Sequence, residues 1–212
     1  SWYMEKPARR VVKGMMGGLG LEMLRDLTRD PDQHYYTSTS SRLTLALLRR
    51  VGFRMLDHSK QVWRAKPGMK TPQGFEVVRD EATILSAVDA RWRRVIEDHR
   101  AWPVYPLLVR SQGRALFMMV ATSMKGDDET WHDVMSCSDP DLLAAWGQSI
   151  ANAVLHNEDG RFACDERFCN GEPEGAQTVK LDVARYFKSQ ALAPRHFDHL
   201  YSEIQLLGQK LS

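Results

Sequence analysis

The sequence predicts an α/β (α+β) protein in which a mixed central sheet is flanked by helices. Two observations carry this prediction. Segments with helical spacing of apolar residues alternate along the chain with short apolar runs that are typical of strands. The clearest hairpin, with strands over 104–110 and 114–121, is apolar along most of its length. Such strands are typical of a sheet that is covered on both faces.

Size and composition narrow the class of protein. A chain of 212 residues is long enough for one large domain or two small ones. The net charge of +2 does not favour nucleic acid or an anionic membrane surface as a partner. No apolar run approaches the roughly 18 residues of a membrane span. Cys137, Cys164 and Cys169 are an odd number without framework spacing, which favours a reducing, cytoplasmic location.

The first block of the chain has the pattern of an anion-binding unit. A short strand around Val11 and Val12 is followed by a glycine-dense turn over 13–20 and a helix to about Leu27. A second strand over 34–37 leads into a helix over 41–51, which ends at Gly52 and Phe53. Glycine lets the backbone approach a ligand closely, and the helix N-terminus offers unpaired N–H groups to an anion.

This block resembles the second half of the GCN5-related N-acetyltransferases (GNAT), which move an acyl group from acyl-coenzyme A to an amine. Gly18-Leu19-Gly20 and the following 21–24 resemble the pyrophosphate-binding turn and its helix. Residues 47–54 resemble the closing helix with its Gly-Phe pair, and residues 2–4 the end of the preceding strand. The resemblance covers residues 1–66. It implies acetyl-CoA or another acyl-CoA as the cofactor, with no metal. The residues implied to bind the cofactor are Lys13, Met15, Gly17, Gly18, Leu19 and Gly20.

The sequence departs from the family pattern at its chemical positions. Met15 stands where the basic residue opens the turn, so Lys13 or Arg10 would supply the charge. Leu48 replaces the usual general-acid tyrosine, and Ser41 replaces a frequent asparagine on the closing helix.

Four residues are therefore candidates for proton transfer. Their positions beside the expected cofactor turn make them catalytic candidates: His34, Tyr35, Tyr36 and Ser41. Histidine changes its charge near neutral pH, and tyrosine can protonate a leaving thiolate. The alternative interpretation is that Tyr35 and Tyr36 are ordinary strand aromatics.

A cluster of proline and glycine over 66–74 predicts a boundary, with one block over 1–67 and a second over 75–212. The second block is an α/β segment that could be a degenerate GNAT-like copy. Beyond the hairpin, we expect strands over 75–78 and 161–164, helices over 81–99 and 180–190, and a helix that begins at Asp139-Pro140 and ends near 156.

The last expected helix, after Pro194, has a heptad pattern of apolar residues. The seam consists of Phe197, Leu200, Ile204, Leu207 and Leu211. It would pack on its own domain or form a homodimer. The chain begins without methionine and ends on this helix, so we expect a segment of a longer protein.

The preferred functional prediction is an acyl-CoA-dependent N-acyltransferase, or a divergent relative, acting on a small-molecule or protein amine. The alternative is a non-catalytic ligand-binding, sensor or interaction module coupled through its C-terminal helix. Met15 and Leu48 at the chemical positions favour the alternative.

Overall fold

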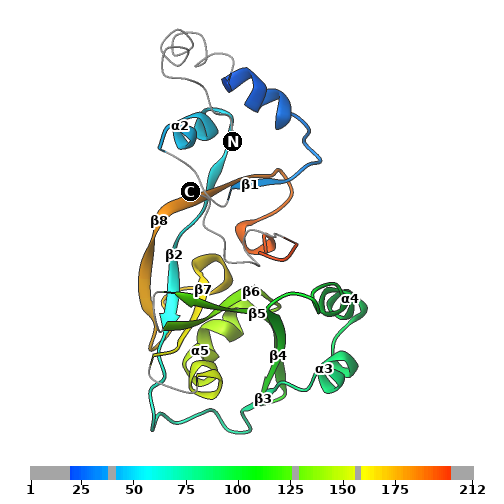
Figure 1. Ribbon diagram of the computed structural model, residues 1–212, viewed down its shortest axis with the longest axis vertical. Coiled ribbons are helices and arrows are strands. Elements are labelled where there is room, and N and C mark those ends of the chain that lie inside the picture. The colour runs from blue at the N-terminus through cyan, green and yellow to red at the C-terminus, as the bar shows by residue number, and fades with distance from the viewer. Residues whose placement is uncertain (1–19, 38–41, 126–128, 156–158, 202–212) are drawn as a thin grey trace. The chain divides into compact units, whose positions relative to one another are not determined.

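The computed structural model describes residues 20–37, 42–125, 129–155 and 159–201. The described strands form a mixed sheet of eight strands in the order β1-β8-β2-β7-β6-β5-β4-β3, which confirms the predicted α/β class (Figure 1). Strands β6 and β7 run parallel, whereas the pairs β1–β8, β2–β7, β3–β4, β4–β5 and β5–β6 run antiparallel. Residues 20–27 are helical. The further elements are β1 (Tyr35–Thr37), α2 (Arg42–Arg50), β2 (Arg54–Trp63), β3 (Glu76–Val78), α3 (Glu81–Ala87), α4 (Ala90–Asp98), β4 (Val104–Ser111), β5 (Arg114–Lys125), β6 (Glu129–Cys137), α5 (Pro140–Val154), β7 (Arg161–Asp165), η1 (Glu166–Phe168), β8 (Gln177–Lys188) and η2 (Pro194–His196).

The chain divides into two compact units that are interleaved in sequence. Unit 1 comprises Ser1–Leu56 and Val183–Pro194, and unit 2 comprises Asp57–Asp182 and Arg195–Ser212. Strands β2 and β8 therefore each pass from one unit into the other. The predicted boundary at 66–74 falls within unit 2.

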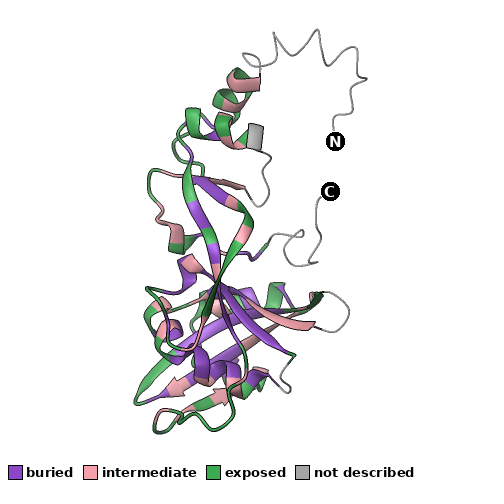
Figure 2. Ribbon diagram, turned by 90° about the vertical axis from the view of Figure 1, so that its left-hand side faces the viewer, coloured by how far each residue is buried: buried purple, intermediate pink, exposed green. Residues whose placement is uncertain are grey.

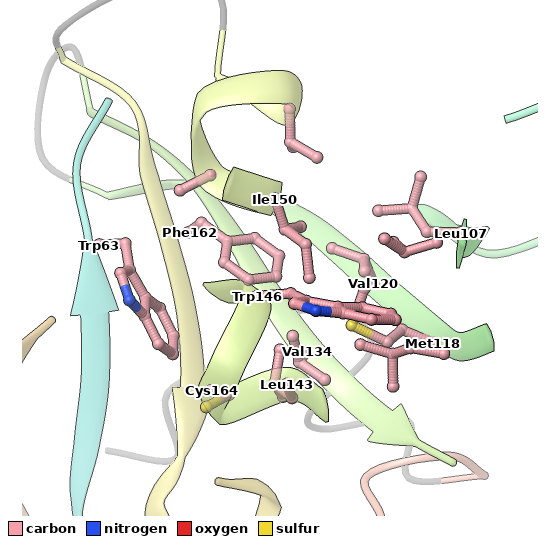
Figure 3. Packing of buried hydrophobic residues seen from close by; sticks show 14 of the residues in the cluster. Trp63, Leu107, Met118, Val120, Val134, Leu143, Trp146, Ile150, Phe162 and Cys164 are labelled. Carbon is pink, nitrogen blue, oxygen red and sulfur yellow. The ribbon is translucent and has the colours of Figure 1, made fainter. Parts of the chain in front are cut away.

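Unit 2 has two cores, one on each face of its sheet. Along β4, Leu107 and Val109 belong to the core on the α5 face, whereas Leu108 belongs to the core that includes α3 and α4. This alternation follows from the period of two in a strand. Figure 2 shows buried residues along the strands of this unit, and Figure 3 shows Trp146 and Ile150 of α5 among the side chains of the first core. The prediction of a sheet covered on both faces is confirmed.

Several predicted elements of unit 2 are present at or near their expected bounds. The hairpin between β4 and β5 turns through Gln112 and Gly113, whose φ angles are 51° and 76°. Two successive positive φ angles are typical of a type I′ turn, which matches the twist of the strands. Helix α5 begins with Pro140 after the N-cap Asp139, whose carboxylate accepts from the backbone N–H of Asp141 and Leu142. Strands β3 and β7 also lie where they were predicted.

The single helix predicted over 81–99 is wrong, because the structure has two helices here. Helix α3 ends at Ala87, and α4 begins at Ala90. The carboxylate of Asp89 accepts from the backbone N–H of Trp92 at 3.0 Å and caps the second helix. An aspartate in this position competes with continued helix and favours a new start.

The helix predicted over 180–190 is also wrong, since Gln177–Lys188 is strand β8. Its apolar residues Val179, Leu181 and Val183 alternate with Lys180 and Asp182, which is the period of a strand. Strand β6, Glu129–Cys137, was not predicted.

The predicted last helix is wrong for the residues that the structure describes. Only Pro194–His196 forms a short 3-10 helix, and 197–200 is irregular. Phe197 and Leu200, the first two residues of the expected seam, are buried in unit 2. The other seam residues lie outside the described ranges.

Unit 1 is built around a small core in which α2 packs against β8. Leu48, Val51 and Phe53 are buried there together with Tyr186 of β8. The guanidinium of Arg49 lies over the Tyr186 ring, 5.3 Å from its centroid, and its Nε donates to the phenol oxygen at 3.1 Å. The predicted strand before α2 and the helix itself are both present.

The Gly-Phe pair at the end of α2 is a helix cap. Gly52 has φ +89°, and the backbone N–H of Phe53 donates to Leu48 O while that of Gly52 donates to Arg49 O. These two bonds define a Schellman motif, in which the residue after glycine packs back onto the helix. Phe53 and Leu48 are both in the unit 1 core. The pair therefore has a structural role that requires no ligand.

Replacing Gly52 with alanine should destabilise unit 1 by about 1–2 kcal/mol, because an L side chain is strained in the left-handed region. No atom lies within 4 Å of the position of the added Cβ, so strain and not a clash is the cause. Thermal unfolding of Gly52→Ala and of Gly52→Asn would measure it. Asparagine tolerates this conformation better, so an asparagine variant as unstable as the alanine variant would contradict the explanation.

Candidate functional site

Unit 1 contains a cavity of about 220 Å³ at the end of strands β1 and β8. Known small-molecule sites are usually larger, about 300–1,000 Å³. The cavity thus suits a small ligand or one end of a larger one. It is lined by Thr28, Arg29, Asp30, Pro31, Gln33, Tyr35, Gly52, Lys188, Ser189 and Gln190.

Strand pairing brings the two walls of the cavity together. Strands β1 and β8 are antiparallel, and Tyr35 lies directly opposite Lys188. Directly opposed residues share a face of the sheet. The neighbouring pair, Tyr36 and Phe187, therefore belongs to the other face. The register explains why Tyr35 lines the cavity and Tyr36 does not.

Lys188 fixes one wall of the cavity. Its ammonium group donates to the Thr28 carbonyl oxygen at 2.7 Å and contacts the Thr28 hydroxyl at 3.1 Å. The Thr28 hydroxyl in turn donates to Leu24 O at 2.8 Å. These bonds attach the end of helix 20–27 to strand β8. They also leave a positive charge at the cavity wall.

Ser189 and His34 form a polar pair at the same end of β8. The Ser189 hydroxyl oxygen accepts from the backbone N–H of Leu192 at 2.8 Å and of Ala191 at 3.2 Å. His34 Nδ1 lies 3.1 Å from this oxygen. Because two donors already occupy the oxygen, we assign its hydrogen to the bond with His34 Nδ1. The imidazole is then neutral, with its own proton on Nε2.

Of the four predicted catalytic residues, Tyr35 lines the cavity and His34 contacts the lining residue Ser189. Tyr36 is half-buried on the opposite face of β1. Ser41 lies outside the described residues, as do Lys13, Met15, Gly17, Gly18 and Leu19. Gly20, the last of the predicted cofactor-binding residues, begins the described part of helix 20–27.

Sequence reasoning missed Lys188 and Ser189, because the region 180–190 was predicted to be helical. The period-two alternation over 179–183 was the pattern that could have identified the strand. Even then, the pairing of β8 with β1 joins residues more than 150 positions apart, which local patterns do not reveal.

The thiols of Cys137 and Cys164 are buried and are held in their protonated form. Burial raises the pKa of the Cys137 thiol to about 12, and burial raises that of Cys164 well above its ordinary value. Thiols held in the protonated form are poor nucleophiles and poor ligands. Among the described residues, no group of three or more His, Cys, Asp or Glu side chains is arranged to hold a metal ion. None of the helices described here is long and apolar enough to cross a membrane.

No family model and no curated protein matches the chain. Solved structures similar to it include a GCN5-related N-acetyltransferase from Anabaena variabilis, with 10% identity, a TM-score of 0.43, and coverage of 80% of this chain and 49% of that chain. Eis1 from Mycobacterium abscessus has 13% identity, a TM-score of 0.39, and coverage of 83% and 52%. A functionally unknown conserved protein from Staphylococcus epidermidis has 10% identity, a TM-score of 0.38, and coverage of 80% and 77%.

The chain spans about half the length of the first two of these structures. The first bears the family name that the sequence motifs suggest. At such identities and TM-scores the likeness carries no information about activity.

Proposed function

We propose that the chain is an acyltransferase-like protein whose unit 1 transfers an acyl group from acyl-coenzyme A to an amine. The observation that supports the proposal is a small cavity lined by Tyr35 and Ser189, with His34 Nδ1 3.1 Å from the Ser189 hydroxyl oxygen. Proton donors and acceptors beside a cavity are what aminolysis of a thioester requires. The order of strand, helix and strand around the cavity is the one that the family resemblance led us to expect.

The cavity is too small for a whole acyl-coenzyme A, so in this proposal it holds the acceptor amine. The acyl donor is assigned to the turn Gly17–Gly20, most of which lies outside the described residues. The donor would supply an activated thioester carbonyl.

The residues of the cavity would handle two protons. As the amine nitrogen forms a bond to the carbonyl carbon, its proton passes to His34 Nδ1, which the Ser189 hydroxyl orients. As the carbon–sulfur bond breaks, the thiolate takes a proton from the Tyr35 hydroxyl. The products are an amide and a free thiol, and exchange with water restores Tyr35 and His34. General acid–base assistance of this kind contributes about 10²–10⁴-fold to a rate.

The test combines binding and turnover. Acetyl-CoA is titrated calorimetrically into the protein and into Gly18→Glu, and thiol release is then followed with a panel of small amines. We expect saturable binding that Gly18→Glu abolishes. We expect Tyr35→Phe and His34→Gln each to lower kcat about 100-fold while leaving binding intact.

Tyr36→Phe is the matched control, since Tyr36 lies on the other face of the same strand. It should leave kcat within about twofold. Absence of binding at millimolar acetyl-CoA would refute the proposal. Binding without turnover by any amine would favour the sensor alternative.

A further inference from the structure

The segment Phe197–Tyr201, here called the strap, lies in unit 2 at the point where two strands separate. The parallel pairing of β6 with β7 ends at Val134 and Cys164. The next carbonyl of β6, that of Met135, accepts from the backbone N–H of His199 at 2.9 Å. Beyond the point where β7 diverges from β6, the strap therefore supplies the hydrogen-bond donor to the β6 backbone.

Apolar burial and one arginine hold the first part of the strap. Phe197 and Leu200 are 7% and 5% exposed, although neither lies in a helix or strand. Arg167 Nε donates to the Phe197 carbonyl at 2.7 Å. The His199 ring contacts both Asp165 and Arg167. This end of the strap is anchored at several points.

A buried imidazole holds the backbone of the last residue of the strap. His99 is 2% exposed, and its Nδ1 lies 2.8 Å from Val95 O. A carbonyl oxygen can only accept, so the proton of the ring is on Nδ1. His99 Nε2 therefore carries a lone pair, and it accepts from the backbone N–H of Tyr201 at 3.2 Å. The docked strap requires His99 in its neutral form.

Tyr201 is held in a strained position. Its φ of 59° is in the left-handed region, which a bulky residue rarely adopts. Its hydroxyl donates to Asp98 Oδ2 at 2.7 Å, and its ring meets the His99 ring edge-on, with 4.6 Å between centroids. The side chain is nevertheless 63% exposed. Little burial opposes its release once the bond to His99 is lost.

The charged groups beside the strap come from three elements. Asp98, the last residue of α4, and Arg94 of α4 act on Tyr201. Asp198 lies on the strap, and Arg91 of α4, Arg167 of η1 and His99 act on it. Burial raises the pKa of Asp198. A carboxyl with a raised pKa favours the docked state at low pH and disfavours it as pH rises. Its effect is opposite in sign to that of His99.

We propose that the strap is a pH-sensitive element. It stays docked on unit 2 while His99 is neutral and is released when His99 is protonated. Protonation places a hydrogen on Nε2, so that two N–H donors face each other and the bond to Tyr201 is lost. Release begins at Tyr201 and proceeds towards His199, which exposes the Met135 carbonyl and the apolar sites of Phe197 and Leu200. The bond to Tyr201 is present while His99 Nε2 carries a lone pair and is lost when that nitrogen is protonated.

Amide hydrogen exchange measures directly whether the strap is docked. The protection factors of the Tyr201 and His199 amides, corrected for intrinsic exchange, are compared between about pH 8 and about pH 5, where histidine changes charge. We expect protection at Tyr201 to fall at least about tenfold in the native sequence. In His99→Gln, whose amide can accept but does not titrate, it should change less than about twofold. Asp198→Asn is the matched control and should retain the loss at low pH.

Nitrogen-15 shifts of the His99 ring provide a second readout that does not depend on a variant. We expect a protonated Nδ1 and a bare Nε2 at high pH, and two protonated nitrogens over the range in which protection is lost. Equal pH profiles in the native sequence and His99→Gln would overturn the proposal. A ring protonated on Nε2 at high pH would also overturn it.

Discussion

Replacing Arg167 with methionine should lower the free energy of unfolding by about 3–5 kcal/mol, the largest effect that we expect from a single substitution. Its guanidinium pairs with Asp57 and lies 2.9 Å from Asp165 Oδ2. The three side chains are almost completely buried. Methionine fills a similar volume but removes the cation that two buried carboxylates share, of which Asp165 keeps its contacts with Lys60 and His199. Removing one partner of a buried ion pair is strongly destabilising. Chemical denaturation at neutral pH measures the loss.

Arg100→Met is the control for Arg167→Met. Arg100 donates twice to Glu81 Oε1, but both side chains are substantially exposed. Exposed pairs contribute about 0–1 kcal/mol. Comparable losses in the two variants would mean that burial is not the source of the effect. In the triple variant with Asp57→Asn and Asp165→Asn, the cost of removing Arg167 should fall markedly, because the stranded charges are gone.

Replacing Gly147 with alanine should destabilise unit 2 by about 3 kcal/mol. Gly147 lies within α5 at its closest approach to Trp63, and an added Cβ would come within 2.6 Å of Trp63 Cε2 and closer still to Cζ2. The indole cannot move aside easily. It is fully buried, packs against Phe162 with 5.7 Å between ring centroids, and donates from Nε1 to Glu174 O. Overpacking of this kind typically costs about 1–3 kcal/mol.

Gly20→Ala is the matched substitution, since Gly20 is also helical and nothing lies within 4 Å of its added Cβ. Alanine favours a helix over glycine by about 1 kcal/mol, so this variant should be neutral or stabilised. The pair Gly147→Ala with Trp63→Phe should be more stable than the sum of the single variants, because the smaller ring makes room for the Cβ. Thermal unfolding of the four proteins would test this, and strict additivity would contradict it.

The elements that could be predicted from the sequence are those specified by neighbouring residues. The turn at Gln112 and Gly113 and the cap at Asp139 and Pro140 are determined within four residues, and the structure has both. Strand β8 was predicted to be a helix over 180–190, although Val179, Leu181 and Val183 alternate with polar residues in the period of a strand.

The same distinction applies to the candidate site. His34 and Tyr35 could be identified because they lie on a short strand beside a glycine turn. Ser189 could not be identified, because its role depends on a pairing between distant strands. The pairing of Arg167 with Asp57 joins residues 110 positions apart, and hydropathy would place both side chains at the surface. The burial of such charges can be identified only from the assembled three-dimensional structure.

The interleaving of the two units has a consequence for how the protein can be divided. Val183–Pro194 belongs to unit 1, but the chain on either side of it belongs to unit 2. A fragment that ends at Asp182 would lose the strap, which belongs to unit 2. Topologically, the twelve residues from 183 to 194 are an insertion in unit 2, and the docked strap closes the loop that contains them. Releasing the strap opens that loop, and the chain entropy regained depends only weakly on the loop length. Truncation would therefore remove one end of this loop. Circular permutation would allow the two units to be separated while both ends of the loop are kept.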